Sequence, residues 1–85
     1  FYKAVALLQD ADESYRFFRD VCTIPELRAM EQRFEVARLL TQGLVYSEIL
    51  ERTGASSATI SRVARSLTDS TGGYECIFKR MKETK

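Results

Sequence analysis

The chain is organised around the stretch Tyr46-Ser-Glu-Ile-Leu-Glu-Arg-Thr-Gly-Ala-Ser-Ser-Ala-Thr-Ile-Ser-Arg-Val-Ala-Arg65. It predicts a helix, a sharp turn at Gly54 and a second helix from Ser56 to Leu67. Two helices that meet at a steep angle need a small residue at the corner and apolar residues that hold them together. The apolar residues here are Ile49, Leu50, Ala55, Ile60 and Val63. The pattern is therefore typical of a helix-turn-helix.

The second of these helices carries polar groups of the kind that contact DNA. Short hydroxyls and arginines can enter a major groove and reach base edges or phosphates. Here they are Ser57, Thr59, Ser61, Arg62 and Arg65. The net charge of +1 is unevenly spread, since residues 1–51 hold six basic and nine acidic side chains and residues 52–85 hold seven and three. A positive half favours a polyanionic partner, although a solvated basic face would explain the same charge.

Length and composition predict one small domain that pairs with a second copy. The chain has 85 residues, of which 45% are apolar. A domain of this size buries only about two-thirds of the surface that its unfolded chain exposes. So large an apolar fraction favours burial against a partner subunit, and a homodimer is the simplest such assembly.

The residues that most enzymes and metal sites need are missing. There is no histidine, and the two cysteines, Cys22 and Cys76, form no CxxC motif. These facts argue against a zinc or redox site, and we expect buried free thiols. With no nucleophile elbow, and with most carboxylates on solvated helix faces, neither an enzyme nor a cofactor is predicted.

Nothing in the sequence points to a membrane. No apolar run approaches the roughly 20 residues that a membrane span needs, and no signal peptide is visible. We therefore expect a cytoplasmic protein. The chain begins at Phe1 rather than at Met, so native residues are expected to precede it.

Two helices are predicted at the start of the chain. Phe1 to Gln9 has apolar residues at helical spacing. Asp10 and Glu13 have the spacing of a capping box, with Asp12 as a competing cap, so a new helix should start near residue 11. Its aromatic and apolar stripe includes Tyr15, Phe18 and Cys22.

The third helix has the strongest local signal in the chain. In Thr23-Ile-Pro-Glu26, the threonine can cap, the proline suits the first turn and the glutamate completes a capping box. The helix should run to about Gln42 and stop at Gly43. About half of its circumference is apolar, and that arc consists of Leu27, Met30, Phe34, Val36, Ala37 and Leu40. Arg28, Glu31, Gln32 and Glu35 occupy the opposite side.

Arg33 falls in the middle of the apolar arc. A half-buried arginine is costly unless an anion meets it, so Arg33 could receive a ligand carboxylate or a DNA phosphate. A pair with Glu26, or a side chain that reaches water at the edge of the arc, would equally explain its position.

The end of the chain predicts a linker and a last helix. Thr68 to Gly73 is polar and turn-forming. Tyr74, Ile77, Phe78 and Met81 follow at the spacing of an amphipathic helix, whose apolar stripe we expect to pack on the N-terminal helices of a second subunit. The whole pattern, without strands or internal repeats, predicts an all-α domain of six helices.

Three segments together carry a family resemblance. They are Cys22-Thr-Ile-Pro-Glu-Leu-Arg-Ala-Met-Glu-Gln-Arg33, Ala37 to Gly43, and Gly54-Ala-Ser-Ser-Ala-Thr-Ile-Ser-Arg62. With them the chain resembles the Trp repressor superfamily, and it looks like the small bacterial subgroup labelled YerC/YecD. The resemblance covers essentially all 85 residues. It implies an all-helical, intertwined homodimer that binds double-stranded DNA, with a dimerisation core (residues 1–43 and 73–85) and a helix-turn-helix head (residues 44–68).

The resemblance also implies a candidate effector site. In the Trp repressor, tryptophan wedges between the central and recognition helices, held by a threonine, two arginines and a glycine. Thr23, Arg33 and Arg62 match the first three, whereas Val63 stands at the glycine. A β-branched side chain where the indole needs room should block the pocket. Tryptophan is therefore not expected as co-repressor, and both a smaller anionic effector and no effector stay open.

The DNA contacts that the resemblance implies come from the start of the recognition helix. On this sequence they fall at Ser56, Ser57, Ala58 and Ser61, with Thr59 beside them and Arg62 and Arg65 further along. Glu48 replaces a basic residue that the Trp repressor uses in the first helix of the motif, which predicts weaker binding. That first helix also lacks a good cap, since Val45 and Tyr46 stand where Ser or Thr is preferred.

Taken together, the sequence predicts a sequence-specific DNA-binding regulator of transcription, in the sense of a repressor, that acts as a homodimer on a palindromic site. The alternative from another class is a protein-interaction module that retains the fold without specific DNA binding. Glu48 and the near-neutral charge favour that alternative.

Overall fold

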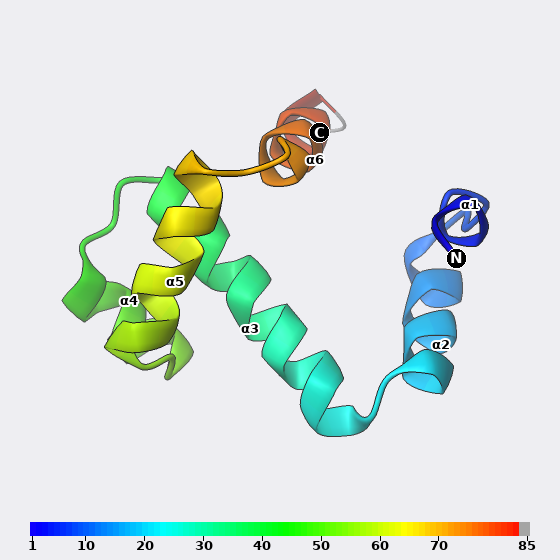
Figure 1. Cartoon of the computed structure of the whole chain (residues 1–85), viewed down its shortest axis with the longest axis horizontal. Coiled ribbons are helices and arrows are strands. Elements are labelled where there is room, and N and C mark those ends of the chain that lie inside the picture. Colours follow the sequence, from blue (N-terminus) through cyan, green and yellow to red (C-terminus); the bar gives the residue numbers. More distant parts are fainter. Residues whose placement is uncertain (84–85) are drawn as a thin grey trace. The chain divides into compact units, whose positions relative to one another are not determined.

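The computed structural model of the chain describes residues 1–83. Within them it contains six helices and no strand, in the order α1 to α6 (Figure 1). These are α1 Tyr2–Val5, α2 Ala11–Val21, α3 Ile24–Thr41, α4 Tyr46–Thr53, α5 Ser57–Thr68 and α6 Gly73–Glu83. The prediction of an all-α chain with six helices is confirmed.

The chain divides into two compact units, Phe1–Met30 and Glu31–Lys85. The predicted division into a dimerisation core and a head follows other boundaries, because it joins the first and last helices. That division stays a prediction.

The first helix is shorter than the sequence predicted. It ends at Val5, and the bonds Leu7 N–H to Ala4 O and Leu8 N–H to Val5 O then close tighter, three-residue turns. The capping box of α2 explains why the helix does not continue to Gln9. The Asp10 carboxylate accepts a hydrogen bond from the Glu13 N–H at 2.8 Å, and the Glu13 carboxylate accepts one from the Gln9 N–H at 3.0 Å. The predicted box is thus confirmed and fixes the start of α2.

The first unit holds an aromatic cluster with little burial of its own. Phe17 and Phe18 lie edge to face at 5.5 Å between ring centroids, and Phe1 lies 6.0 Å from Phe17. Neither α1 nor α2 contains a buried residue. Cys22, at the end of α2, is half-buried as a free thiol.

A capping box starts α3, as predicted. The Thr23 hydroxyl accepts from the Glu26 N–H at 3.2 Å, and the Glu26 carboxylate accepts from the Thr23 N–H at 2.8 Å. The Thr23 backbone N–H, with a smaller contribution from its hydroxyl, holds the pKa of Glu26 below its usual range. At the other end Gly43 has φ +87°, the left-handed conformation that ends a helix.

The core of the second unit joins α3, α4 and α5. Its fully buried members are Val36, Ala37, Leu39, Ile49, Ala55, Ile60 and Val63. Val36 and Ala37 were predicted to face the core, but Leu39 was not, and its side chain is 1% exposed. Conversely Met30, predicted in the apolar arc, is exposed. The apolar face of α3 is therefore displaced toward Leu39 because α4 and α5 pack there.

The last helix is amphipathic as predicted, and its apolar stripe is divided. Tyr74 and Phe78 stack at 5.8 Å and pack partly buried against the core, with Phe34 at 5.3 Å from Phe78. Ile77 and Met81 remain exposed. Cys76 is an exposed free thiol, so the prediction that it is buried was wrong, because it lies off the stripe that packs on the core.

The described part of the chain holds neither a cluster of metal-binding side chains nor a membrane-spanning helix. Among residues 1–83, no group of histidine, cysteine or carboxylate side chains could hold a metal ion. In the same range, no helix is long and apolar enough to cross a membrane.

Candidate nucleic-acid interface

The turn between α4 and α5 is built on Gly54. Its φ of +73° is a left-handed conformation, and its N–H donates to the Leu50 carbonyl at 2.9 Å to end α4. The predicted order of helix, glycine turn and helix is thus confirmed. Ile49, Ile60 and Val63 hold the two helices together as predicted. Leu50 does not, because its side chain is exposed.

Thr53 organises this turn, and sequence reasoning did not single it out. Its hydroxyl donates to the Ile49 carbonyl at 2.8 Å and accepts from the Ala55 N–H at 3.1 Å. Its own carbonyl accepts from the side-chain amide of Gln32 on α3 at 3.1 Å. The turn is therefore bonded both to α4 and to the central helix.

Ser56 is the N-cap of α5, which starts at Ser57, one residue later than predicted. The Ser56 Oγ accepts from the Thr59 N–H at 3.2 Å and donates to the Thr59 Oγ1 at 3.1 Å. These two hydroxyls are engaged in the cap. The side chains of Ser57 and Ala58 come next and are exposed.

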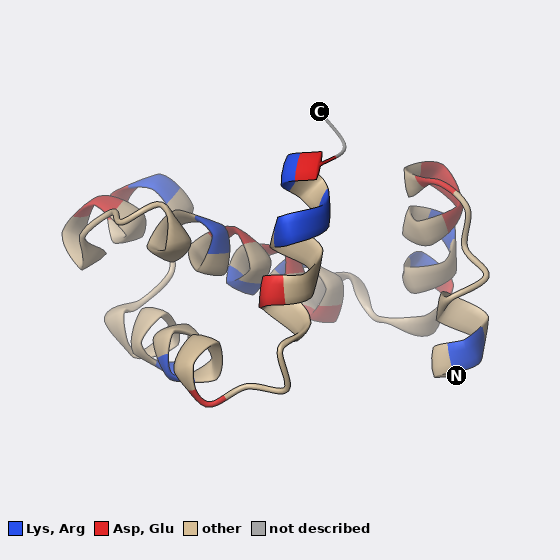
Figure 2. Ribbon diagram, turned by 90° about the horizontal axis from the view of Figure 1, so that it is seen from above, with Lys and Arg blue, Asp and Glu red and all other residues tan. Residues whose placement is uncertain are grey.

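The remaining predicted DNA-contacting residues also lie on α5. Arg62 and Arg65 are exposed, whereas Thr59 and Ser61 are half-buried. Charged side chains on α5 are limited to these two arginines, while α4 carries charges of both signs (Figure 2). The exposed surface of α5 is thus basic and rich in hydroxyls.

Glu48 on α4 is ion-paired with Arg52. The carboxylate and guanidinium lie 3.2 Å apart, one helical turn from each other. Sequence reasoning counted Glu48 as a repulsive charge and missed Arg52, although the four-residue spacing is the one that favours such a pair. The predicted lack of a cap on α4 is confirmed, because Val45 makes no side-chain capping bond.

The residues of the candidate effector site fall in both units. Thr23 lies in the first unit, with its hydroxyl engaged at the start of α3. Arg33 is half-buried and Arg62 exposed in the second unit. Within residues 1–83 Arg33 makes no ion pair, so the alternative of a pair with Glu26 is not observed. Val63 is 2% exposed, inside the core.

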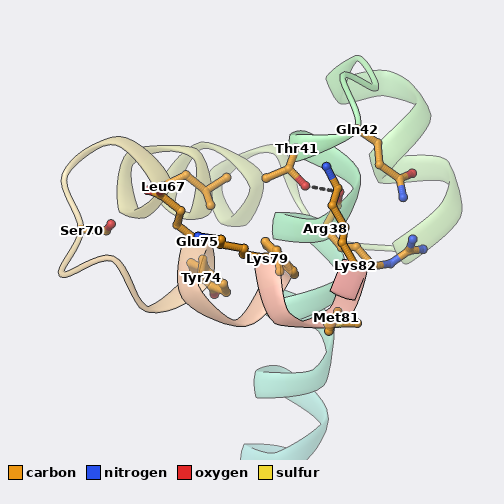
Figure 3. Close-up of a pocket in the computed structure, with 11 residues that line it drawn as sticks. Arg38, Thr41, Gln42, Leu67, Ser70, Tyr74, Glu75, Lys79, Met81 and Lys82 are labelled. Atoms are coloured by element: carbon orange, nitrogen blue, oxygen red, sulfur yellow. Dashed lines mark hydrogen bonds between the residues drawn. The ribbon is translucent and has the colours of Figure 1, made fainter. Parts of the chain in front are cut away.

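A groove lies on the second unit, between the end of α3, the end of α5 and α6. Figure 3 shows its lining, in which apolar Leu67, Tyr74 and Met81 alternate with Lys79 and Lys82. Arg38 also lines it. The Glu35 carboxylate, in a two-point bond with Arg38 at 2.9 and 2.7 Å, raises the pKa of that guanidinium and has its own pKa lowered. None of the predicted site residues lines this groove.

Comparison with known proteins places this fold among regulators. The sequence profile of the Trp repressor protein family matches residues 1–82. The chain belongs to the Trp repressor family. Within this family it is 48% identical over 83 residues to the uncharacterized protein YerC of Bacillus subtilis (strain 168), which covers 98% of the chain and 80% of YerC.

Solved structures agree with this assignment to the Trp repressor family. A TrpR-like protein from Eubacterium eligens ATCC 27750 is 51% identical, with a TM-score of 0.90 over 95% of this chain and 84% of that one. A structure from Staphylococcus aureus is 42% identical, also with a TM-score of 0.90, over 95% and 81%. The family consists of DNA-binding regulators rather than enzymes, which confirms the prediction that this chain is not an enzyme.

Proposed function

We propose that this chain is a sequence-specific transcriptional repressor that binds double-stranded DNA as a homodimer through α5. The observation that carries the proposal is the exposed first turn of α5. Ser57 and Ala58 are exposed there, while Ile60 and Val63, further along the same helix, are buried in the core. Such a helix can enter a major groove without any loss of core packing.

Electrostatics supports the same surface. Arg62 and Arg65 are exposed on α5, and among the described residues neither guanidinium has an acidic partner. The free N–H groups of a helix N-terminus favour a phosphate. These features would fix the helix on the DNA backbone while Ser57 and Ser61 face the bases.

Exposed apolar side chains support the homodimer. Tyr2 is 84% exposed and Leu7 76% exposed in the first unit, and Ile77 and Met81 are exposed on α6. Apolar side chains on this scale favour burial against another chain. A regulator of this kind acts in the cytoplasm, where the bacterial chromosome lies.

Tryptophan is not the effector in this proposal. Val63 stands at the position where the Trp repressor has a glycine. Its side chain is packed in the core with Ile60 and Ile49. An indole at that position would have to displace buried methyl groups, and overpacking costs about 1–3 kcal/mol or more. A smaller anion that binds Arg33 remains compatible with the proposal.

Genome-wide mapping of binding sites, followed by anisotropy titration at two salt concentrations, tests the function. We expect specific binding with a steep salt dependence, because each dimer neutralises several phosphates. Arg65→Ala should weaken binding to all sequences alike, whereas Ser57→Ala should change the preference among them. If the protein binds every genomic site no more tightly than random DNA at low salt, the proposal fails. A stable protein partner recovered from the same cells would then favour the interaction-module alternative.

A further inference from the structure

One hydrogen bond of the second unit joins the central helix to the turn before α5. The Gln32 side-chain N–H donates to the Thr53 carbonyl at 3.1 Å across 21 residues of sequence, and the bond is partly shielded from water. Thr53 is the last residue of α4. A carbonyl in the last turn of a helix has no partner within that helix, so Gln32 supplies the missing donor from α3.

Thr53 also controls the direction in which the chain enters α5. The Thr53 hydroxyl accepts the Ala55 N–H at 3.1 Å, and Ala55 is 1% exposed in the core. The next residue is Ser56, the N-cap of α5. Gln32, Thr53 and Ala55 therefore form a continuous path from α3 to the start of the proposed DNA-binding helix.

This path adds a directional constraint that core packing does not supply. Apolar contacts among Val36, Ile49 and Ile60 hold the helices together, but such contacts are non-directional. A hydrogen bond weakens steeply when its angle departs from linearity. The bond from Gln32 therefore restricts rotation of the turn relative to α3 in a way that the core alone does not.

We propose that Gln32 is a positioning residue for DNA binding. It holds the Thr53 turn on α3 and so fixes the orientation of the N-terminal turn of α5. This inference rests on the proposed function, because its effect is measured in the affinity for the specific site.

Gln32→Met tests the inference, because methionine keeps the length of glutamine and removes the donor. Gln42→Met is the matched control: Gln42 lies just beyond the same helix, and within residues 1–83 its side chain makes no hydrogen bond. Thr53→Val is a second variant, which removes the hydroxyl that orders the turn. Hydrogen exchange at the Ala55 and Thr59 amides is measured without DNA, and affinity is measured on the mapped site and on random DNA.

We expect Gln32→Met and Thr53→Val to speed amide exchange by about threefold to tenfold, the equivalent of one net hydrogen bond. Affinity for the specific site should fall by a similar factor, while affinity for random DNA stays near wild type. Gln42→Met should leave all three quantities unchanged.

Two results would overturn the inference. Unchanged exchange in Gln32→Met would show that the bond does not hold the turn. Faster exchange with unchanged specific affinity would show a structural role alone. If the wild type lacks a specific site altogether, the proposed function fails first, and the exchange experiment still reports separately on the bond.

Discussion

At the scale of single residues, Gly54 is a position where the backbone conformation constrains the sequence. Its φ is +73°, and a Cβ added there would meet no atom within 4 Å. The cost of Gly54→Ala is therefore backbone strain, and we expect the free energy of unfolding to fall by about 1–2 kcal/mol. Gly73→Ala is the control, because Gly73 lies in open space without a positive φ. Urea unfolding at fixed protein concentration measures both, and equal losses would contradict the explanation.

Glu48 is a residue whose effect on DNA binding depends on one neighbour, Arg52. Arg52 compensates its charge at 3.2 Å, and replacement by glutamine would release that guanidinium. We expect Glu48→Gln to raise affinity for DNA and to steepen the salt dependence by about one charge per subunit. Stability should change by only about 0.3–0.5 kcal/mol, as for other exposed pairs.

The control for this change is Glu75→Gln, which removes the same charge from α6. Anisotropy titration across a salt series compares the two variants. If Glu75→Gln has an equal effect, net charge rather than the position on α4 governs DNA binding.

At the scale of the helix, the capping box of α3 links stability to pH. The Thr23 N–H, and then its hydroxyl, hold the pKa of Glu26 below the usual 4.5. The folded pKa is thus lower than the unfolded one. The stabilisation by the Glu26 carboxylate is therefore present above the usual glutamate range and is lost as pH falls through the folded pKa.

An NMR titration of the Glu26 carboxyl carbon checks this prediction. We expect a pKa below 4.5 in the wild type and a partial return toward that value in Thr23→Ala, which loses the hydroxyl but keeps the backbone N–H. In Glu26→Gln the start of α3 should lose its dependence on acid pH. A wild-type carboxyl that titrates at the usual value would refute the role of the box.

The helix boundaries show which signals a sequence can carry. The Ser56 cap was missed, since the helix was predicted to begin at that residue. The caps at Asp10 and Thr23 were predicted because each bond joins residues three apart. Leu39 and Gln32 were not, because their partners lie on α4 and α5 or in the turn between them. A helical wheel assigns one apolar face to a helix. It cannot show that α4 and α5 pack on α3 beside that face.

The candidate site divides in the same way. The order of residues along α5 and the core role of Ile60 followed from periodicity alone. The engagement of Ser56 and Thr59 with each other needed the cap geometry, and the role of Thr53 needed the contact from α3. Sequence therefore identified the helix that we propose reads DNA, and the structure was required to find what holds it in place.

At the scale of the whole molecule, exposed apolar side chains occur both in the predicted dimerisation core and in the head. Leu7 belongs to the predicted dimerisation core and is 76% exposed, whereas Leu50 belongs to the predicted head and is 46% exposed. If the partner subunit covers Leu7 but not Leu50, only Leu7 contributes to dimer stability. The two leucines therefore provide a matched pair.

We expect Leu7→Lys to dissociate the dimer and Leu50→Lys to leave it intact. Burial of one leucine contributes about 1.5–3 kcal/mol, and a twofold-symmetric interface uses each residue twice. The dissociation constant should therefore rise by at least about tenfold in Leu7→Lys, as measured by sedimentation equilibrium over a concentration series. The melting temperature of the wild type should also rise with protein concentration, because dimerisation stabilises the folded chain by mass action. A wild type that stays monomeric, or a Leu50→Lys variant that dissociates as readily as Leu7→Lys, would contradict the assignment of residues 1–43 and 73–85 to the subunit interface.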